Sequence, residues 1–171
     1  RWAKIFNLKQ AAQTLIFLQE NDMFEMEKLQ QKAQQAKDDF NNLSSRIQTI
    51  DARLKDISAL QKHIGIYSKT REVYAGYRKA GYSKKHLAEH EDSINAHKAA
   101  KKYFDSLGLK KLPTIKTLQT EYATLSAEKK KLYGEYHPAR KYMQDILTAK
   151  QNAEQLLNYR ETEKTKESER I

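Results

Sequence analysis

The sequence of 171 residues has no cysteine, two prolines, five glycines and no long hydrophobic run. Without cysteine, the chain can form no disulfide, thiolate zinc site or cysteine nucleophile. No stretch approaches the run of about 18 apolar residues that a membrane-spanning helix needs, and no signal-peptide pattern is present. We therefore expect a cytoplasmic protein without membrane insertion.

Composition favours long helices with narrow apolar stripes, because 39% of the residues are hydrophobic, 32% are charged, and helix breakers are scarce. Such helices bury little surface per residue, so we expect no deep catalytic core. Because the sequence begins at Arg1 rather than Met, we also expect it to be a piece of a longer protein.

Two stretches carry apolar or near-apolar residues at alternating steps of three and four. The first series is Leu29, Ala33, Ala36, Phe40, Leu43, Ile47, Ile50, Leu54, Ile57, Leu60 or Gln61, and Ile64. The second is Leu118, Tyr122, Leu125, Lys129, Leu132, Tyr136, Ala139, Met143, Ile146, Lys150, Ala153 and Leu157. This heptad spacing predicts an elongated all-α fold, a long helical hairpin resembling an antiparallel coiled coil. Heptads can pair within one chain or between two, so a homodimer through the seams stays open.

The expected organisation has an N-terminal helix within 1–24 that packs on a helical domain at 25–158. Within that domain we expect stalk helices at about 25–66 and 114–158, joined by a basic helical tip at about 67–113. The second helix either breaks near Gly65 or continues to about Lys79. A break leaves two short helices between the long ones and makes the long helices antiparallel, whereas a continuous helix makes them run the same way. We favour the antiparallel hairpin because its two seams of equal length then bury each other fully. Ser83 is a natural N-cap for a segment that Gly108 ends. Pro138 predicts a bend, and the charged tail at 159–171 is expected to be disordered.

The formal net charge of +10 is concentrated in the expected tip. Residues 61–85 carry a net +6 and residues 98–116 a net +5, while residues 86–97 between them carry −3. Lysines and arginines interleaved with tyrosines can hold phosphates and stack on bases. The candidate nucleic-acid-binding residues are Lys69, Arg71, Tyr77, Arg78, Lys79, Tyr82, Lys84, Lys85, Lys98, Lys101, Lys102, Lys110 and Lys111. The alternative is that the tyrosines are packing residues and the lysines a solvated face.

His86-Leu-Ala-Glu89-His90 matches the H-x-x-E-H pattern of inverted zinc peptidases, in which two histidines bind zinc and the glutamate acts as a base. A five-residue pattern with three fixed positions is weakly specific, and His97 is the nearest further histidine. We therefore predict solvated helix histidines, with no catalytic residue, metal ligand or cofactor, and keep a zinc hydrolase as a remote alternative.

Several short segments of the sequence resemble the C-terminal helical region of mobilisation-type relaxases from Gram-positive conjugative and mobilisable elements. They lie at 1–10 (RWAKIFNLKQ), 67–74 (YSKTREVY), 77–82 (YRKAGY), 97–102 (HKAAKK), 111–118 (KLPTIKTL), 121–123 (EYA), 127–131 (AEKKK) and 149–150 (AK). Together they extend over nearly the whole chain.

In that family, an N-terminal domain nicks the transfer origin with a tyrosine nucleophile and a histidine-bound metal. The paired histidines separated by one hydrophobic residue that such a nuclease uses are absent here, so no catalytic residue is carried over. The resemblance implies a non-catalytic region that assists binding of transfer-origin DNA, single-stranded or duplex, or docks relaxosome accessory or coupling proteins. A coiled-coil interaction arm without DNA binding is the alternative.

Overall fold

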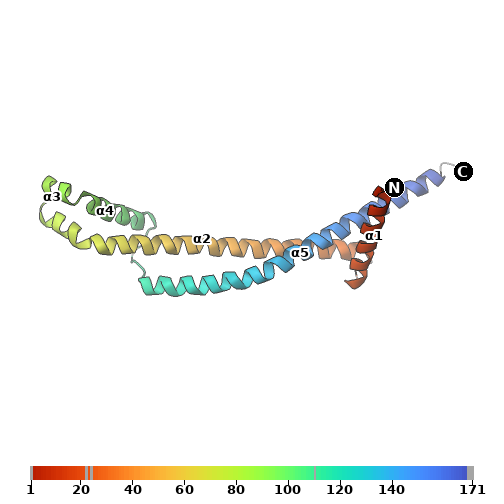
Figure 1. Cartoon of the computed structure of the whole chain (residues 1–171), viewed down its shortest axis with the longest axis horizontal. Coiled ribbons are helices and arrows are strands. Elements are labelled where there is room, and N and C mark those ends of the chain that lie inside the picture. Colours follow the sequence, from red (N-terminus) through yellow and green to blue (C-terminus); the bar gives the residue numbers. More distant parts are fainter. Residues whose placement is uncertain (1, 22, 24, 110, 169–171) are drawn as a thin grey trace. The chain divides into compact units, whose positions relative to one another are not determined.

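In the computed structural model, the described residues form five helices and no strand, which confirms the all-α prediction. The structure describes residues 2–21, 23, 25–109 and 111–168, and their side chains except those of 2–8, 156, 159 and 160–168. The helices are α1 (Trp2–Glu20), α2 (Met26–Lys79), α3 (Lys84–Glu89), α4 (Glu91–Ser106) and α5 (Ile115–Ser168) (Figure 1). None of them, as far as the description reaches, has a stretch long and apolar enough to cross a membrane.

The fold divides into two compact units, and each contains part of α2 and part of α5. The first unit comprises residues 1–47 and 131–171, and the second comprises residues 48–130. In the first unit Phe40 of α2 contacts Tyr136 of α5, with ring centroids 5.1 Å apart. In the second, Arg53 of α2 forms a two-pronged ion pair with Glu121 of α5 at 2.6 and 3.0 Å. The order of contacts along the chain makes α5 antiparallel to α2 in each unit, as predicted.

The heptad positions pair within the chain. In the first unit Leu29, Ala33 and Ala36 form one buried cluster with Ile146 and Ala149 of α5. In the second, Ile57 and Leu60 of α2 are buried with Leu118 of α5 and with Ala100 and Phe104 of α4. The predicted seams are thus the contacts that hold the helices together.

Two lysines occupy positions in the second seam, and each of them forms an ion pair. Lys129 forms an ion pair with Asp51 of α2. Lys150 lies 3.7 Å from Glu154, one turn further along α5. Their long aliphatic stems can cover apolar surface while the charged ends reach a carboxylate.

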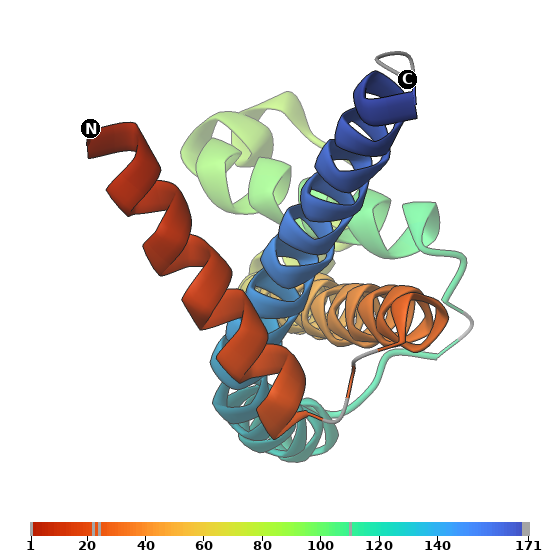
Figure 2. The ribbon, with the colours of Figure 1, turned by 90° about the vertical axis from the view of Figure 1, so that its right-hand side faces the viewer.

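Helix α1 packs on α5 in the first unit (Figure 2). Leu18 and Met23 join the buried cluster of that unit, and the rings of Phe17 and Tyr142 lie 6.4 Å apart. Asn152 Nδ2 donates a hydrogen bond of 2.9 Å to the hydroxyl of the buried Thr14, which satisfies a polar group inside this contact.

The favoured break near Gly65 is wrong, because α2 continues to Lys79. A glycine inside a helix costs about 1 kcal/mol relative to alanine. The residues on both sides of Gly65 offset that cost, because Ile64, Ile66 and Tyr67 are partly buried against the cluster formed with α4. The boundary expected between stalk and tip at 66 and 67 therefore falls inside one continuous helix.

The chain reverses in the turn after α2, where Gly81 and Tyr82 have φ angles of 62° and 61°. Tyr82 N–H donates to the Tyr77 carbonyl at 3.0 Å, and Gly81 N–H donates to that of Arg78 at 3.1 Å. These two bonds form a Schellman motif, which ends a helix with a residue in the left-handed region. Ser83 then caps α3 as predicted, accepting the His86 N–H at 3.4 Å.

The segment expected to run unbroken from Ser83 to Leu107 is divided at His90. His90 has φ −134° and ψ 30°, outside the helical region, and α4 begins directly after it. Glu91 and Asp92 stand in the first turn of α4, where the helix dipole favours negative charge. This acidic start stabilises a new helix at a point where the sequence shows no glycine or proline. Gly108, with φ 63°, ends α4 as predicted.

Helices α4 and α5 both run antiparallel to α2 within the second unit (Figure 1). The connection at 107–114 therefore does not reverse the chain, and the antiparallel pairing of α2 with α5 does not depend on a break at Gly65. Thr114 accepts the Thr117 N–H at 3.1 Å and caps α5, which begins at Ile115.

Helix α5 passes through Pro138 and continues to Ser168, so the tail expected to be disordered is helical as far as that residue. Glu and Lys dominate 160–168 and are good helix formers. Extending an existing helix also avoids the cost of nucleation. Residues 169–171 of the predicted tail lie outside the described residues. The bend at Pro138 stays a prediction.

Candidate nucleic-acid interface

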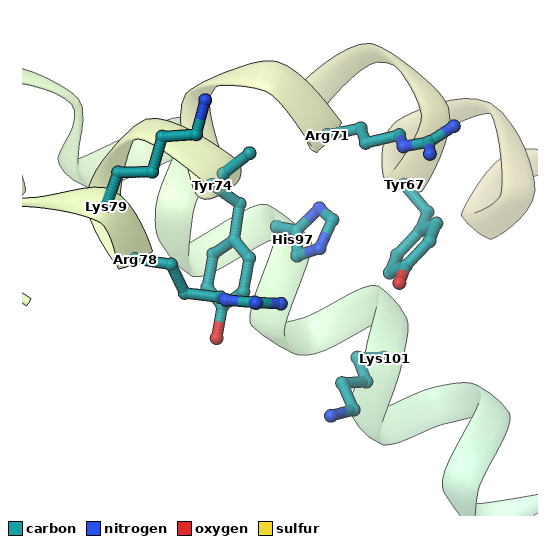
Figure 3. A pocket seen from close by; sticks show the side chains of 8 residues that line it. Tyr67, Arg71, Tyr74, Arg78, Lys79, His97 and Lys101 are labelled. Atoms are coloured by element: carbon teal, nitrogen blue, oxygen red, sulfur yellow. The ribbon is translucent and has the colours of Figure 1, made fainter.

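A hollow of about 470 Å³ opens between the end of α2 and α4 in the second unit. We call it the basic hollow, and its lining residues are Tyr67, Arg71, Tyr74, Ala75, Arg78, Lys79, His97 and Lys101 (Figure 3). Four of these side chains are cationic, and none of the residues lining the hollow is a carboxylate. Such a site attracts anions and offers them several charge-assisted hydrogen bonds.

Helical spacing places these residues together. On α2, Tyr67, Arg71, Tyr74 and Arg78 are separated by steps of four, three and four, which puts them on one face. On α4, His97 and Lys101 are one turn apart and face the same space. The hollow forms because the turn at Gly81 brings α4 back along α2.

His97 lies at the centre of an aromatic stack. Its ring is parallel to that of Tyr67, with centroids 4.2 Å apart at 21°, and to that of Tyr74, at 4.3 Å and 17° (Figure 3). The residue is 3% exposed. The stack fixes both the imidazole and the two tyrosines whose rings line the hollow.

The hydrogen bonds around His97 assign its tautomer. Thr70 Oγ1 donates its single hydrogen to the Ile66 carbonyl at 2.7 Å, so it accepts from His97 Nδ1 at 2.9 Å. Burial lowers the pKa of His97, and the positive charge of Lys101 acts in the same direction, while a hydrogen bond with the Tyr67 backbone opposes them. This shift disfavours the charged imidazolium, so the positive charge of the hollow comes from its four cationic side chains.

The aromatic faces near the basic hollow are mostly occupied by other rings. Tyr67 and Tyr74 each use one face for His97, and Tyr67 also contacts Phe104 edge-on, with centroids 5.6 Å apart. The candidate residue Tyr77 is 6% exposed, with Lys98 Nζ 5.3 Å above its ring centroid. Tyr82 is 57% exposed. Tyr77 is thus a packing residue, and Tyr82 is the candidate tyrosine whose ring reaches solvent.

The structure brings four of the sequence candidates into the basic hollow, namely Arg71, Arg78, Lys79 and Lys101. The others are exposed but do not line it: Lys69, Lys84, Lys85, Lys98, Lys102 and Lys111. Lys110 lies outside the described residues. His97 also lines the hollow and was not among the predicted residues. The signal that could have found it is its one-turn spacing from Lys101.

The motif residues His86, Glu89 and His90 also come together, at the junction of α3 and α4, with one potential ligand atom from each within 4.8 Å of the others. His97 does not join them, because it is enclosed between tyrosines of α2. The third ligand that a zinc peptidase would take from His97 is therefore missing.

Comparisons of the chain with protein-family models, curated proteins and solved structures give no match.

Proposed function

We propose that this chain is a non-catalytic, cytoplasmic helical region of a conjugative DNA relaxase that helps to bind transfer-origin DNA through the basic hollow. The observation that carries the proposal is the meeting of four cationic side chains from two helices without a lining carboxylate. The resemblance of the short sequence segments to mobilisation-type relaxases supports nucleic acid as the anion that binds in the hollow.

Phosphate contact is the mode of binding that the residues favour. Arg71 and Arg78 carry planar guanidinium groups that can hold a phosphate with two parallel hydrogen bonds, and Lys79 and Lys101 add compact charges. The rings of Tyr67 and Tyr74 already stack on His97, which leaves them little surface for bases. We therefore infer that the hollow positions a strand through its backbone and reads little sequence.

The test compares two variants of equal net charge by fluorescence anisotropy with single-stranded and duplex oligonucleotides. In the first, Arg71, Arg78, Lys79 and Lys101 are replaced by Glu. In the second, four exposed lysines away from the hollow are replaced by Glu: Lys32, Lys37, Lys130 and Lys141. Circular dichroism checks that both remain helical.

We expect the hollow variant to lose binding near physiological salt and the matched control to retain most of it. Equal losses in both variants would reduce the interaction to net charge and reject the hollow as the site. Unchanged affinity in the hollow variant would reject it as well.

A second candidate function, a protein-interaction arm, is favoured by one observation on α1. Leu15 and Ile16 are adjacent and are 56% and 55% exposed. If this surface docks a relaxosome accessory or coupling protein, replacing both residues with Ser should abolish that binding and leave affinity for DNA unchanged. Loss of both activities would show that α1 supports the fold instead.

A further inference from the structure

We propose that His86, Glu89 and His90 form a binding site for a divalent transition metal, with Zn²⁺ as the ion their chemistry suits. Two imidazoles and a carboxylate are among the ligands that zinc takes in proteins. The proposal goes beyond DNA binding and does not depend on it, because none of the three residues lines the basic hollow.

The backbone already gathers the ligands. His86 and Glu89 are three residues apart on α3, and His90 follows at the fourth position as its C-cap, so all three lie on one face. One potential ligand atom from each lies within 4.8 Å of the others, and the two imidazole centroids are 4.8 Å apart. Ligand atoms bound to one zinc ion lie about 2 Å from it, so small rotations of the side chains are enough to close the site.

His86 is the fixed member of the site. Its ring lies nearly parallel to that of Tyr77, at 14° with centroids 6.2 Å apart. Its Nε2 is buried against α2, where a Cβ added at Gly76 would come within 3.3 Å of it. Because Nε2 is closed to solvent, we expect His86 to bind the ion through Nδ1. Glu89 and His90 are exposed and free to turn toward it.

The start of α4, beside His90, is acidic. Residues 86–97 are the acidic interruption between the two basic runs of the chain. Glu91 and Asp92 follow His90 directly and line a hollow of about 370 Å³ together with Glu89, His90 and their neighbours. The negative charges raise the local concentration of cations beside the ligands.

The expected consequence of metal binding is structural. A bound ion would tie α3 to His90, where the helix is interrupted, and so fix the angle at which α4 begins. Three protein ligands leave one position for water. Hydrolysis is not part of the proposal, because Glu89, the base in the peptidase pattern, is here a ligand.

The test uses untagged protein freed of metal with a chelator and titrated with Zn²⁺ by calorimetry and with Co²⁺ by visible absorption. We expect one saturable site per chain and cobalt bands typical of nitrogen and oxygen ligands. His90→Ala and Glu89→Gln should each weaken binding at least about tenfold, as the loss of a ligand should cost no less than the loss of a supporting contact. His137→Ala, which removes an exposed histidine of α5, is the matched control.

The proposal fails if the titration does not saturate at one ion per chain. It also fails if His90→Ala and Glu89→Gln bind as tightly as the unaltered protein, since binding then occurs elsewhere. Circular dichroism without metal establishes that the variants are folded, and the conservative Glu89→Gln change keeps the test valid if His90→Ala is unstable.

Discussion

Neutralising the basic hollow should change how DNA binding depends on salt, as well as its strength. Each phosphate neutralised by the protein contributes about −0.9 to the slope of log K against log salt for duplex DNA and about −0.7 for single strands. Four cations line the hollow, so they can account for slopes of at most about −3.6 and −2.8. A fourfold rise in salt would then weaken their contribution roughly 150-fold for duplex and roughly 50-fold for single strands.

The perturbation is Gln at Arg71, Arg78, Lys79 and Lys101, which removes charge while keeping helix propensity close to that of Lys and Arg. Anisotropy titrations from about 50 to about 200 mM salt give the slope for each protein. We expect the variant's slope to be shallower by about one unit or more, and Gln at Lys32, Lys37, Lys130 and Lys141 to leave it nearly unchanged. A weaker variant with an unaltered slope would refute the reasoning, because its cations would then act without releasing counterions.

Four further predictions concern the fold and its titration. Gly65→Ala should raise the free energy of unfolding in urea by about 0.5 to 1 kcal/mol, because the added methyl meets nothing within 4 Å. Gly81→Ala, at a φ of 62°, should lower it by about 1 kcal/mol, and equal effects of the two changes would contradict the assigned backbone. Ile57→Ala should cost about 2 to 5 kcal/mol, since Ile57 is 0% exposed in the cluster of the second unit. The pKa of His97 in the folded chain is lower than its ordinary 6.5. As the pH falls, His97 therefore binds a proton in the unfolded chain before it does so in the folded chain. Stability should therefore fall as pH drops through 6.5 toward the folded pKa, by no more than about 1.4 kcal/mol per pH unit, and His97→Gln should remove that part of the slope.

Heptad periodicity predicted the paired helices because each seam position depends only on the spacing of neighbouring residues. The outcomes at Gly65 and His90 depended on contacts between helices. Gly65 is helical because Ile64 and Tyr67, both partly buried, pack against the cluster formed with α4. His90 interrupts a segment whose local sequence has no breaker, at a place where Glu91 starts a better-capped helix. Local propensity could not decide either case, since packing and end charges each shift the balance by about as much as propensity does.

The candidate site, like the fold, could be predicted from the sequence only in part. Counting charges along the chain was enough to locate the cationic residues near the turn after α2. Which of them meet depends on the face that α4 presents to α2, and Lys101 enters the hollow while its neighbour Lys102 does not. The burial of Tyr77 was not readable from the sequence, because tyrosines at helical spacing fit both a packing stripe and an exposed surface.

The burial of His97 limits the positive charge around the basic hollow. Four like charges around one space repel one another, and a fifth on His97 would add to that repulsion. Its position between the rings of Tyr67 and Tyr74 buries the imidazole, and this burial lowers its pKa and disfavours the charged form. The stack also contributes packing energy that does not depend on charge. The four cationic side chains still repel one another, so an anion such as phosphate that binds among them would stabilise the hollow.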